Sequence, residues 1–391
     1  MSNGKIGIGI KPITMCCLML FLVSCSGSEG VEPNTNETGT ISTWAGTARA
    51  GFDGDGNDLL KSSFYWPVDL SIDKDGTFYI LDWNNHRVRK VTSENTLETV
   101  IGTDFVGDGP QDKSDLVEPG TLGTRVNLNH PTHLLPLDDG TLILTAWHNH
   151  KLRSYDPETG LVYVICGDGP GYRGDNGSYN DALLNQPSQT ILSPDGSLYI
   201  LDQRNQRVRK IDLQGKITTV AGSGVAGFSG DDGPPIEAQI NMPEGSNPQP
   251  GGSIALDNVG RLYISDVLNH RIRRVDFQEN TIETVAGNGV AGFHGDGGDA
   301  TLASLNNPRD IQFGPDQRLY IADELNNRIR VLNIDTGEIS TFAGNGNATY
   351  EGDGGQASQA SLNRPAGIEF DLDGNLYIAD TYNHCIRKIT K

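Results

Sequence analysis

The chain has 391 residues, of which 49 are glycine and only five are cysteine, and its formal net charge is −20. A protein this acidic repels the phosphates of nucleic acid and anionic lipid, because neutralising them needs surplus lysine and arginine. Nucleic acid is therefore not expected as a partner. Only Cys166 and Cys385 lie beyond the N-terminal segment, too few for a disulfide framework or a cysteine-rich zinc site.

The first 24 residues have the pattern of a secretory signal. Lys5 and Lys11 precede an apolar run over residues 13–23. The run is too short to span a bilayer but suits the core of a signal peptide. The run ends in Leu-Val-Ser-Cys, which resembles a bacterial lipobox. We expect residues 1–24 to be a lipoprotein signal peptide and Cys25 to receive the lipid; ordinary cleavage beside a chance cysteine is the alternative.

Residues 25–39 are rich in Ser, Gly, Glu, Asn and Thr and should form a flexible linker behind the lipid anchor. Membrane contact would then come from the acyl chains on Cys25 alone. The expected location is the bacterial cell envelope, at the outer membrane or cell surface.

A motif of the form Leu-Tyr-Ile-x-Asp, followed by Asn-His-Arg-x-Arg, recurs along the rest of the chain at intervals of 56 to 64 residues. The copies end at Asp82, Asp202, Asp266, Asp323 and Asp380, and a degraded copy ends at Ala146. Periods of roughly 40 to 60 residues, built from short strands and turns, are typical of propeller blades.

Each repeat is expected to contain four strands: one after a proline, the Tyr-Ile strand, an alternating Arg-x-Arg strand, and one that ends in Thr-Val-Ala-Gly. A first copy of that last strand, at residues 43–46, precedes every other strand, and the sequence ends after a third strand. The N-terminal copy should therefore complete the sixth blade and remove an exposed edge. We predict an all-β fold over residues 40–391, a six-bladed β-propeller of four-stranded antiparallel blades closed by the N-terminal strand.

These repeats resemble the NHL family, named for the signature seen here as Asn85-His86-Arg87, Asn269-His270-Arg271 and Asn383-His384-Cys385. The resemblance covers about residues 40–391 and implies the propeller fold. For function it implies only a range, because similar propellers serve as protein-binding platforms, RNA binders, sensor domains and a few lyases.

Gly-Asp-Gly triplets recur in the loops between blades, as at residues 54–56, 295–297 and 352–354. Their carboxylates could bind cations, but we expect them to accept backbone N–H groups or to pair with a recurring arginine of the third strand. Those arginines are Arg87, Arg207, Arg271 and Arg328. The histidines of the repeat signature are likewise expected to be scaffold.

Function is expected where the blades depart from the repeat. Two residues after the proline of the first strand, the sixth blade has Gly367, and the equivalents in blades one to five are all polar: Asp69, His133, Gln189, Ser253 (three residues after Pro250) and Asp310. These side chains should ring one end of the central channel, where they could bind a divalent cation or a sugar. The alternative is that they bond neighbouring backbone or channel water.

The loops between blades share one face with the loops between second and third strands; we call it the top face. Two of the loops between blades, 102–131 and 222–250, are longer than the other four. We expect them to rise beside the channel mouth and to contribute to binding, although surface insertions also accumulate by drift.

Trp83 and Trp147 directly follow the second strands of blades one and two. With Asp69, His133 and His148 they would form a carbohydrate platform, with rings against the C–H faces of a sugar. Arg204 and Arg309 could add charge for an acidic ligand. The alternative is that both tryptophans pack between blades.

Two functions follow from these observations. The first is a surface-anchored platform that binds a glycan or protein ligand on its top face. The second is a metal-assisted lyase or lactonase at the channel mouth, in which Asp69, His133 and Asp310 would hold a divalent cation as the cofactor.

Overall fold

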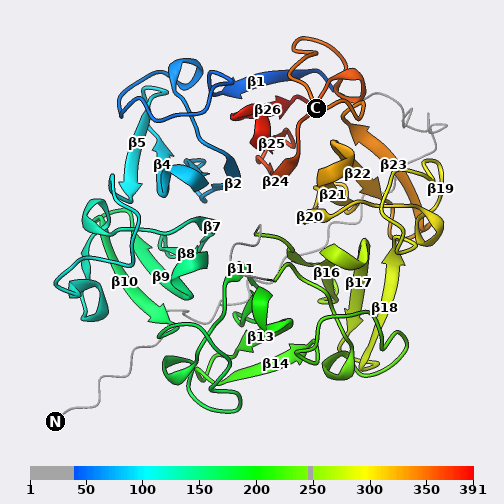
Figure 1. Ribbon diagram of the computed structural model, residues 1–391, viewed down its shortest axis with the longest axis horizontal. Coiled ribbons are helices and arrows are strands. Elements are labelled where there is room, and N and C mark those ends of the chain that lie inside the picture. Colours follow the sequence, from blue (N-terminus) through cyan, green and yellow to red (C-terminus); the bar gives the residue numbers. More distant parts are fainter. Residues whose placement is uncertain (1–38, 245–249) are drawn as a thin grey trace, which may run out of the picture.

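A computed structural model describes residues 39–244 and 250–391 as six antiparallel sheets arranged in a closed ring (Figure 1). The predicted six-bladed propeller is confirmed. The predicted signal peptide, Cys25 and nearly all of the linker lie outside the described residues. Within the described part of the chain, no helix is long and apolar enough to cross a membrane.

Each blade is an antiparallel sheet whose first strand lines the channel. Blade one contains β2 (Pro67–Ile72), β3 (Phe78–Asp82), β4 (Arg87–Val91) and β5 (Leu97–Ile101). Blade two contains β7 (Pro131–Pro136), β8 (Leu142–Ala146), β9 (Lys151–Asp156), β10 (Leu161–Cys166) and, outermost, β6 (Thr121–Leu122). Blade three contains β11 (Pro187–Leu192), β12 (Leu198–Asp202), β13 (Arg207–Ile211) and β14 (Ile217–Ala221).

The remaining blades follow the same order from the channel outward. Blade four contains β15 (Ile254–Leu256), β16 (Leu262–Asp266), β17 (Arg271–Asp276) and β18 (Thr281–Ala286). Blade five contains β20 (Pro308–Phe313), β21 (Leu319–Asp323), β22 (Arg328–Leu332), β23 (Glu338–Ala343) and, outermost, β19 (Gly298–Asp299). Blade six contains β24 (Pro365–Phe370), β25 (Leu376–Asp380), β26 (Cys385–Ile389) and β1 (Ile41–Ala45).

The ring closes through the N-terminal strand, as predicted. β1 pairs antiparallel with β26, with Ile41 opposite Ile389, and the blue and red ends of the chain meet in one sheet (Figure 1). Blades two and five gain a two-residue fifth strand because the loop from the preceding blade runs along the outer edge. In blade one the same contact is a single bridge between Asp58 and Thr96, so this loop covers the edge strand in each case.

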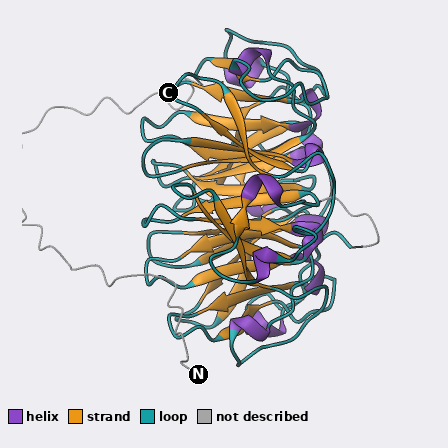
Figure 2. Ribbon diagram, turned by 90° about the vertical axis from the view of Figure 1, so that its left-hand side faces the viewer, coloured by secondary structure: helices purple, strands orange, loops and turns teal. Residues whose placement is uncertain are grey.

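Short 3₁₀ helices are the helical elements of the described residues, and Figure 2 shows most of them toward one side of the disc and its rim. One follows each second strand: η2 (Trp83–Asn85), η5 (Trp147–Asn149), η7 (Gln203–Asn205), η9 (Val267–Asn269), η11 (Glu324–Asn326) and η13 (Thr381–Asn383). The others lie in the loops between blades: η1 (Leu59–Lys61), η3 (Ser114–Leu116), η4 (Gly123–Arg125), η6 (Tyr179–Asp181), η8 (Pro235–Glu237), η10 (Ala300–Leu302) and η12 (Ala357–Gln359).

The histidines of the repeat signature join neighbouring blades. His86 follows η2 in the left-handed conformation, with φ of 56°, and its Nδ1 accepts the backbone N–H of His130 in the next blade at 3.1 Å. His384 makes the equivalent contact with the backbone N–H of Trp66 across the closure, at 3.2 Å. These histidines are therefore scaffold, as expected.

The Gly-Asp-Gly carboxylates pair with arginine, but with a different one from the arginine predicted. The partner of Asp55 is Arg89, a fully buried side chain at 3.2 Å, which also lies 3.8 Å from Asp82. Arg87, the predicted partner, instead lies over the ring of Phe52, 4.0 Å from its centroid. Residues 87 and 89 share a face of the strand, so alternation alone does not choose between them; Arg89 is the one placed within 4 Å of the buried Asp82.

Candidate functional site

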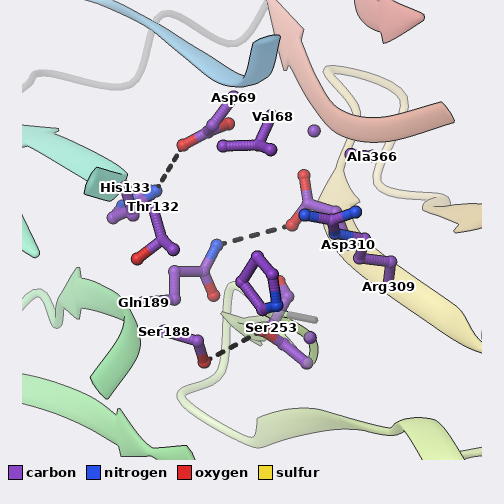
Figure 3. A pocket seen from close by; sticks show the side chains of 14 residues that line it. Val68, Asp69, Thr132, His133, Ser188, Gln189, Ser253, Arg309, Asp310 and Ala366 are labelled. Atoms are coloured by element: carbon purple, nitrogen blue, oxygen red, sulfur yellow. Dashed lines mark hydrogen bonds and ion pairs between the residues drawn. The ribbon is translucent and has the colours of Figure 1, made fainter. Parts of the chain in front are cut away.

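The predicted polar ring does converge, and it forms a narrow throat at the top of the channel (Figure 3). This throat has a volume of about 40 Å³ and is lined by Val68, Asp69, Thr132, His133, Ser188, Gln189, Pro250, Gly251, Gly252, Ser253, Arg309, Asp310, Ala366 and Gly367. Asp69, His133, Gln189 and Asp310 also line a larger cavity of about 340 Å³ in the body of the channel. The ring is thus the boundary between the channel mouth and the channel body.

Asp69 and His133 form a pair across blades one and two. His133 Nδ1 and Asp69 Oδ2 lie 2.8 Å apart, and His133 Nε2 is buried without a hydrogen-bond partner among the described residues. Gly367 makes room for the pair, since a Cβ there would lie only 2.5 Å from Asp69 Oδ1. The glycine of the sixth blade is therefore part of the ring's geometry.

Asp310 is held mainly by backbone. Its Oδ1 accepts the N–H of Ile311 and its Oδ2 accepts the N–H of Ile368, each at 2.9 Å. Burial raises the pKa of Asp310 to about 6, and the negative charge of Asp69 acts in the same direction.

Gln189 and Ser253 are also engaged. Gln189 Oε1 accepts the N–H of Ile254 at 2.5 Å, while its Nε2 lies 3.4 Å from Asp310 Oδ1. Ser253 Oγ accepts the N–H of Ile311 at 3.2 Å. These contacts correspond to the alternative in which ring side chains bond neighbouring backbone.

The predicted cation ligands, Asp69, His133 and Asp310, are not assembled as a coordination set. Residues 39–244 and 250–391 contain no group of three or more His, Cys, Asp or Glu side chains placed to hold a metal ion. Asp310 uses both oxygens on backbone N–H groups, and Asp69 shares one oxygen with His133. The residues present therefore do not fit the predicted divalent cation.

A second tier of polar residues lies below the ring and was missed by the sequence reasoning. Glu369 and Gln312 line the channel body, and Gln312 Nε2 donates to Glu369 Oε1 at 3.1 Å. Burial raises the pKa of Glu369 to about 8, and the charges of Asp69 and Asp310 add to the effect. Alternation along β24, which puts residues 367 and 369 on one face, is the signal that could have found Glu369.

Trp83 and Trp147 are packed between blades, which corrects the predicted platform. Trp147 is 0% exposed and Trp83 is 5% exposed, and both belong to one hydrophobic cluster. Trp147 Nε1 donates to Gln203 Oε1 at 3.1 Å. His148 stacks on Trp147 with ring centroids 4.0 Å apart, so it covers that ring. The tryptophan faces are thus not available to a sugar.

The accessible aromatic surface is provided instead by Trp66 and Tyr382, two half-buried residues that the sequence reasoning missed. Their rings stack with centroids 5.1 Å apart and 22° between planes, and the guanidinium of Arg364 lies over the Tyr382 ring, 4.4 Å from its centroid. Trp66 packs against the hydrophobic cluster that contains Val68 and Ala366, and both of those residues also line the throat. We call Trp66 and Tyr382 the aromatic step.

Next to Trp83, His130 and His148 face each other on the same rim. Their Nδ1 atoms lie 2.8 Å apart, and His130 Nε2 lies 3.2 Å from Asn84 Oδ1. Burial lowers the pKa of His130 to about 3 and of His148 to about 4. These rings are therefore neutral at physiological pH.

Arg309 and Arg204 have different positions. Arg309 lines the throat, whereas Arg204 lies in η7 and is absent from the lining. Arg309 Nη1 is 3.7 Å from Glu324 Oε1. That same oxygen accepts from Arg364 Nε at 2.9 Å and pairs with Arg364 Nη2 at 2.7 Å. Arg364 Nη1 in turn donates to Tyr382 Oη at 2.8 Å, which links the arginines to the aromatic step.

Only one of the two long loops reaches the mouth. The backbone N–H of Asn241 donates to Asp266 Oδ1, and the backbone N–H of Asn363 makes the equivalent bond to Asp380 Oδ1 in blade six. Asn363 lies two residues before Pro365, the first residue of the inner strand of blade six. Pro243, which lies two residues after Asn241, is therefore the equivalent proline of blade four, and Pro250 is not. The extra residues, 244–251, therefore follow that proline, and Pro250 and Gly251 line the throat.

The insertion in loop 102–131 lies at the outer rim instead. Its β6 pairs with the outer strand β10 of blade two. Its Asp115 pairs with the fully buried Arg153. In the other blades the equivalent arginine pairs with an aspartate at the end of the second strand, but blade two has Ala146 at that position. The expectation that this loop rises beside the channel is wrong.

Comparison with known proteins supports the repeat assignment. The NHL repeat model matches residues 64–91 and 362–389. The Arabidopsis thaliana protein SUPPRESSOR OF QUENCHING 1, chloroplastic, is 28% identical over 278 residues, which are 68% of this chain and 25% of that protein. NHL repeat-containing protein 2 of Bos taurus is 26% identical over 314 residues, 72% of this chain and 41% of that protein. The chain therefore spans less than half the length of either relative.

Among solved structures, an auxiliary nutrient binding protein from Bacteroides thetaiotaomicron superposes with a TM-score of 0.61 at 20% identity, covering 91% of this chain and 77% of that one. A protein with the same description from Bacteroides ovatus gives a TM-score of 0.62 at 18% identity, with the same coverage. At these identities the likeness establishes the shared propeller fold.

Proposed function

We propose that this chain, an NHL-repeat β-propeller, is a platform that binds a glycan on its top face, at the mouth of the central channel. The observation that carries the proposal is the junction of two surfaces. The aromatic step is joined through Arg364 to a throat where Arg309 and His133 Nε2 have no hydrogen-bonded partner among the described residues. Sugars need both features, an aromatic face for C–H groups and polar groups for hydroxyls.

A glycan fits this site better than a protein ligand. The throat of about 40 Å³ admits one small polar group, and the aromatic step beside it consists of two adjacent rings. A stable protein interface needs about 800 Å² on each partner, which such a site does not supply alone. The description of the Bacteroides neighbours as nutrient-binding proteins agrees with a binding role.

Titration calorimetry of the purified chain against a panel of oligosaccharides tests the proposal. At least one sugar should bind, and Trp66→Ala should weaken it by about tenfold or more, the usual effect of removing an aromatic contact. Trp44→Ala is the matched control, because Trp44 is also half-buried but packs against Phe78 and Tyr377 in the lower part of the blades. Equal losses in the two variants, or no sugar bound by the wild type, would refute the proposal.

We further propose that the platform is anchored by lipid on Cys25 in the bacterial cell envelope, at the outer membrane or cell surface. The support is the signal-like run over residues 13–23 and the lipobox that ends it. Mass spectrometry of the membrane-extracted protein should find an acylated Cys25 at the mature N-terminus. Cys25→Ser should release the protein from the membrane fraction, and an unmodified Cys25 in the wild type would contradict the anchor.

A further inference from the structure

Among the residues that line the throat, Arg309 is the one arginine or lysine. It directly follows Pro308 at the start of β20, where the other blades have Val68, Thr132, Ser188, Gly252 and Ala366. None of these five side chains is charged. The repeat therefore does not require arginine at this position, and its presence calls for a reason specific to blade five.

The Arg309 residue is largely buried yet poorly paired. The residue is 7% exposed, and it forms no hydrogen bond with any of the described residues; its one ion pair is the 3.7 Å contact with Glu324. Arg364 binds that carboxylate more closely, at 2.7 and 2.9 Å, so two guanidinium groups share one carboxylate. Burial lowers the pKa of Arg309, as expected for a cation removed from water without full compensation.

The other charged groups of the throat are already engaged. Asp310 accepts two backbone N–H groups, and Asp69 is bound by His133. Arg309 and Asp310 both line the throat, and Figure 3 draws the guanidinium of Arg309 over Asp310. A planar guanidinium with free N–H groups matches a carboxylate, which it can bind through two parallel hydrogen bonds.

We propose that the ligand is a carboxylated glycan, one containing a uronic acid, and that Arg309 binds its carboxylate in the throat while the sugar ring rests on the aromatic step. This inference rests on the proposed glycan platform and names its ligand class. The size of the throat agrees with it, because about 40 Å³ accommodates a carboxylate but not a sugar ring. The ring must then stay at the mouth, where Trp66 and Tyr382 lie.

The test compares sugars that differ only at carbon six. Calorimetry is run with oligogalacturonate against oligogalactose, and with oligoglucuronate against oligoglucose. For at least one pair, the wild type should bind the uronate about tenfold or more tightly, because charge-assisted hydrogen bonds are the stronger class. The preference should fall as salt is raised.

Arg309→Gln should abolish the preference, so that each uronate and its matched neutral sugar bind within about twofold of one another. Arg309→Lys should keep part of it, because lysine keeps the charge but not the fork of donors. Arg318→Gln is the control, an arginine of the same blade on the hairpin at the opposite end, paired with Asp316, and it should change nothing. Thermal denaturation verifies that each variant is folded.

The outcomes separate the two proposals. Neutral sugars bound as tightly as uronates, or a preference that survives Arg309→Gln, would overturn the carboxylate inference and leave the glycan platform standing. Failure of all sugars to bind, or binding of an acidic peptide in their place, would overturn both.

Discussion

His133 Nδ1 donates to Asp69 Oδ2 over 2.8 Å and thereby joins the inner strands of blades one and two at the throat. An ionised carboxylate only accepts, so the N–H in this pair is that of Nδ1; in the uncharged ring Nε2 then carries the lone pair. Nitrogen-15 NMR of the wild type should show this tautomer for His133. In Asp69→Ala the preference of His133 for the tautomer protonated on Nδ1 should disappear, and the ring should exchange between both tautomers. A wild-type ring protonated on Nε2 alone would contradict the pairing.

Gly367→Ala should disturb the throat through a steric collision. The added Cβ would lie 2.5 Å from Asp69 Oδ1 and 2.7 Å from Val68 O, and such overpacking costs about 1–3 kcal/mol of unfolding free energy. Gly298→Ala is the control, since its Cβ would meet nothing closer than 3.6 Å. Urea denaturation measures both, and equal stabilities would show that the ring tolerates a side chain in blade six.

Glu369→Gln should change the pH dependence of stability in a defined direction. The folded-state pKa of Glu369 is about 8, above the ordinary 4.5, so folding favours its protonated form. Its contribution is fully present below about pH 4.5 and is lost as pH rises toward 8. The variant, which remains neutral, should therefore gain in melting temperature over the wild type as pH rises across that range.

The exposed Glu338 provides the control for that experiment, because Glu338→Gln changes the same atoms on the outer strand of blade five. Its difference from the wild type should stay small throughout the range. A constant difference for Glu369→Gln as well would mean that Glu369 is ionised in the folded channel at neutral pH.

Asp115→Ala should lower the free energy of unfolding strongly, because blade two has Ala146 where the other blades have an aspartate that pairs with the buried arginine. Arg153 is fully buried and pairs with two carboxylates, the partly exposed Asp108 and the buried Asp115, in a blade where Ala146 replaces the strand aspartate. Breaking a buried pair costs about 3 kcal/mol or more. Asp55→Ala should cost roughly half as much, since Arg89 there keeps the fully buried Asp82, whereas Arg153 without Asp115 keeps only the partly exposed Asp108.

Adding Ala146→Asp to Asp115→Ala should recover part of the lost stability, as chemical denaturation can measure. If Asp115→Ala were no more harmful than Asp55→Ala, the compensation between the insertion and Arg153 would be refuted.

The architecture could be predicted because it is repeated. Six copies of one motif fix the blade number, and the early copy at residues 43–46 predicts the β1 closure that the structure shows. The ring could be predicted for the same reason, because in blades one, two, three, five and six the ring position lies two residues after the proline of the first strand. Glu369 could have been predicted in the same way, because it lies two residues after Gly367 in β24 and therefore on the same face of the strand.

The functional surface was harder to predict because burial depends on contacts between blades. Trp83 and Trp147 occupy a repeat position that faces inward, where neighbouring blades cover them, whereas Trp66 precedes the proline and stays half-buried. Loop length alone also gave a wrong position for the insertion in loop 102–131, which connects blades one and two. The pairing of Asp115 with Arg153, which draws that loop to the outer rim, depends on the loss of a carboxylate at Ala146.

A crystal structure of the chain with its tightest-binding oligosaccharide would locate the ligand. We predict a sugar at the channel mouth, with one ring against Trp66 and Tyr382 and a polar group entering the throat beside Arg309. A sugar bound elsewhere, such as in the cavity of about 530 Å³ lined by Leu116, Tyr163 and Tyr179 between blades two and three, would contradict it.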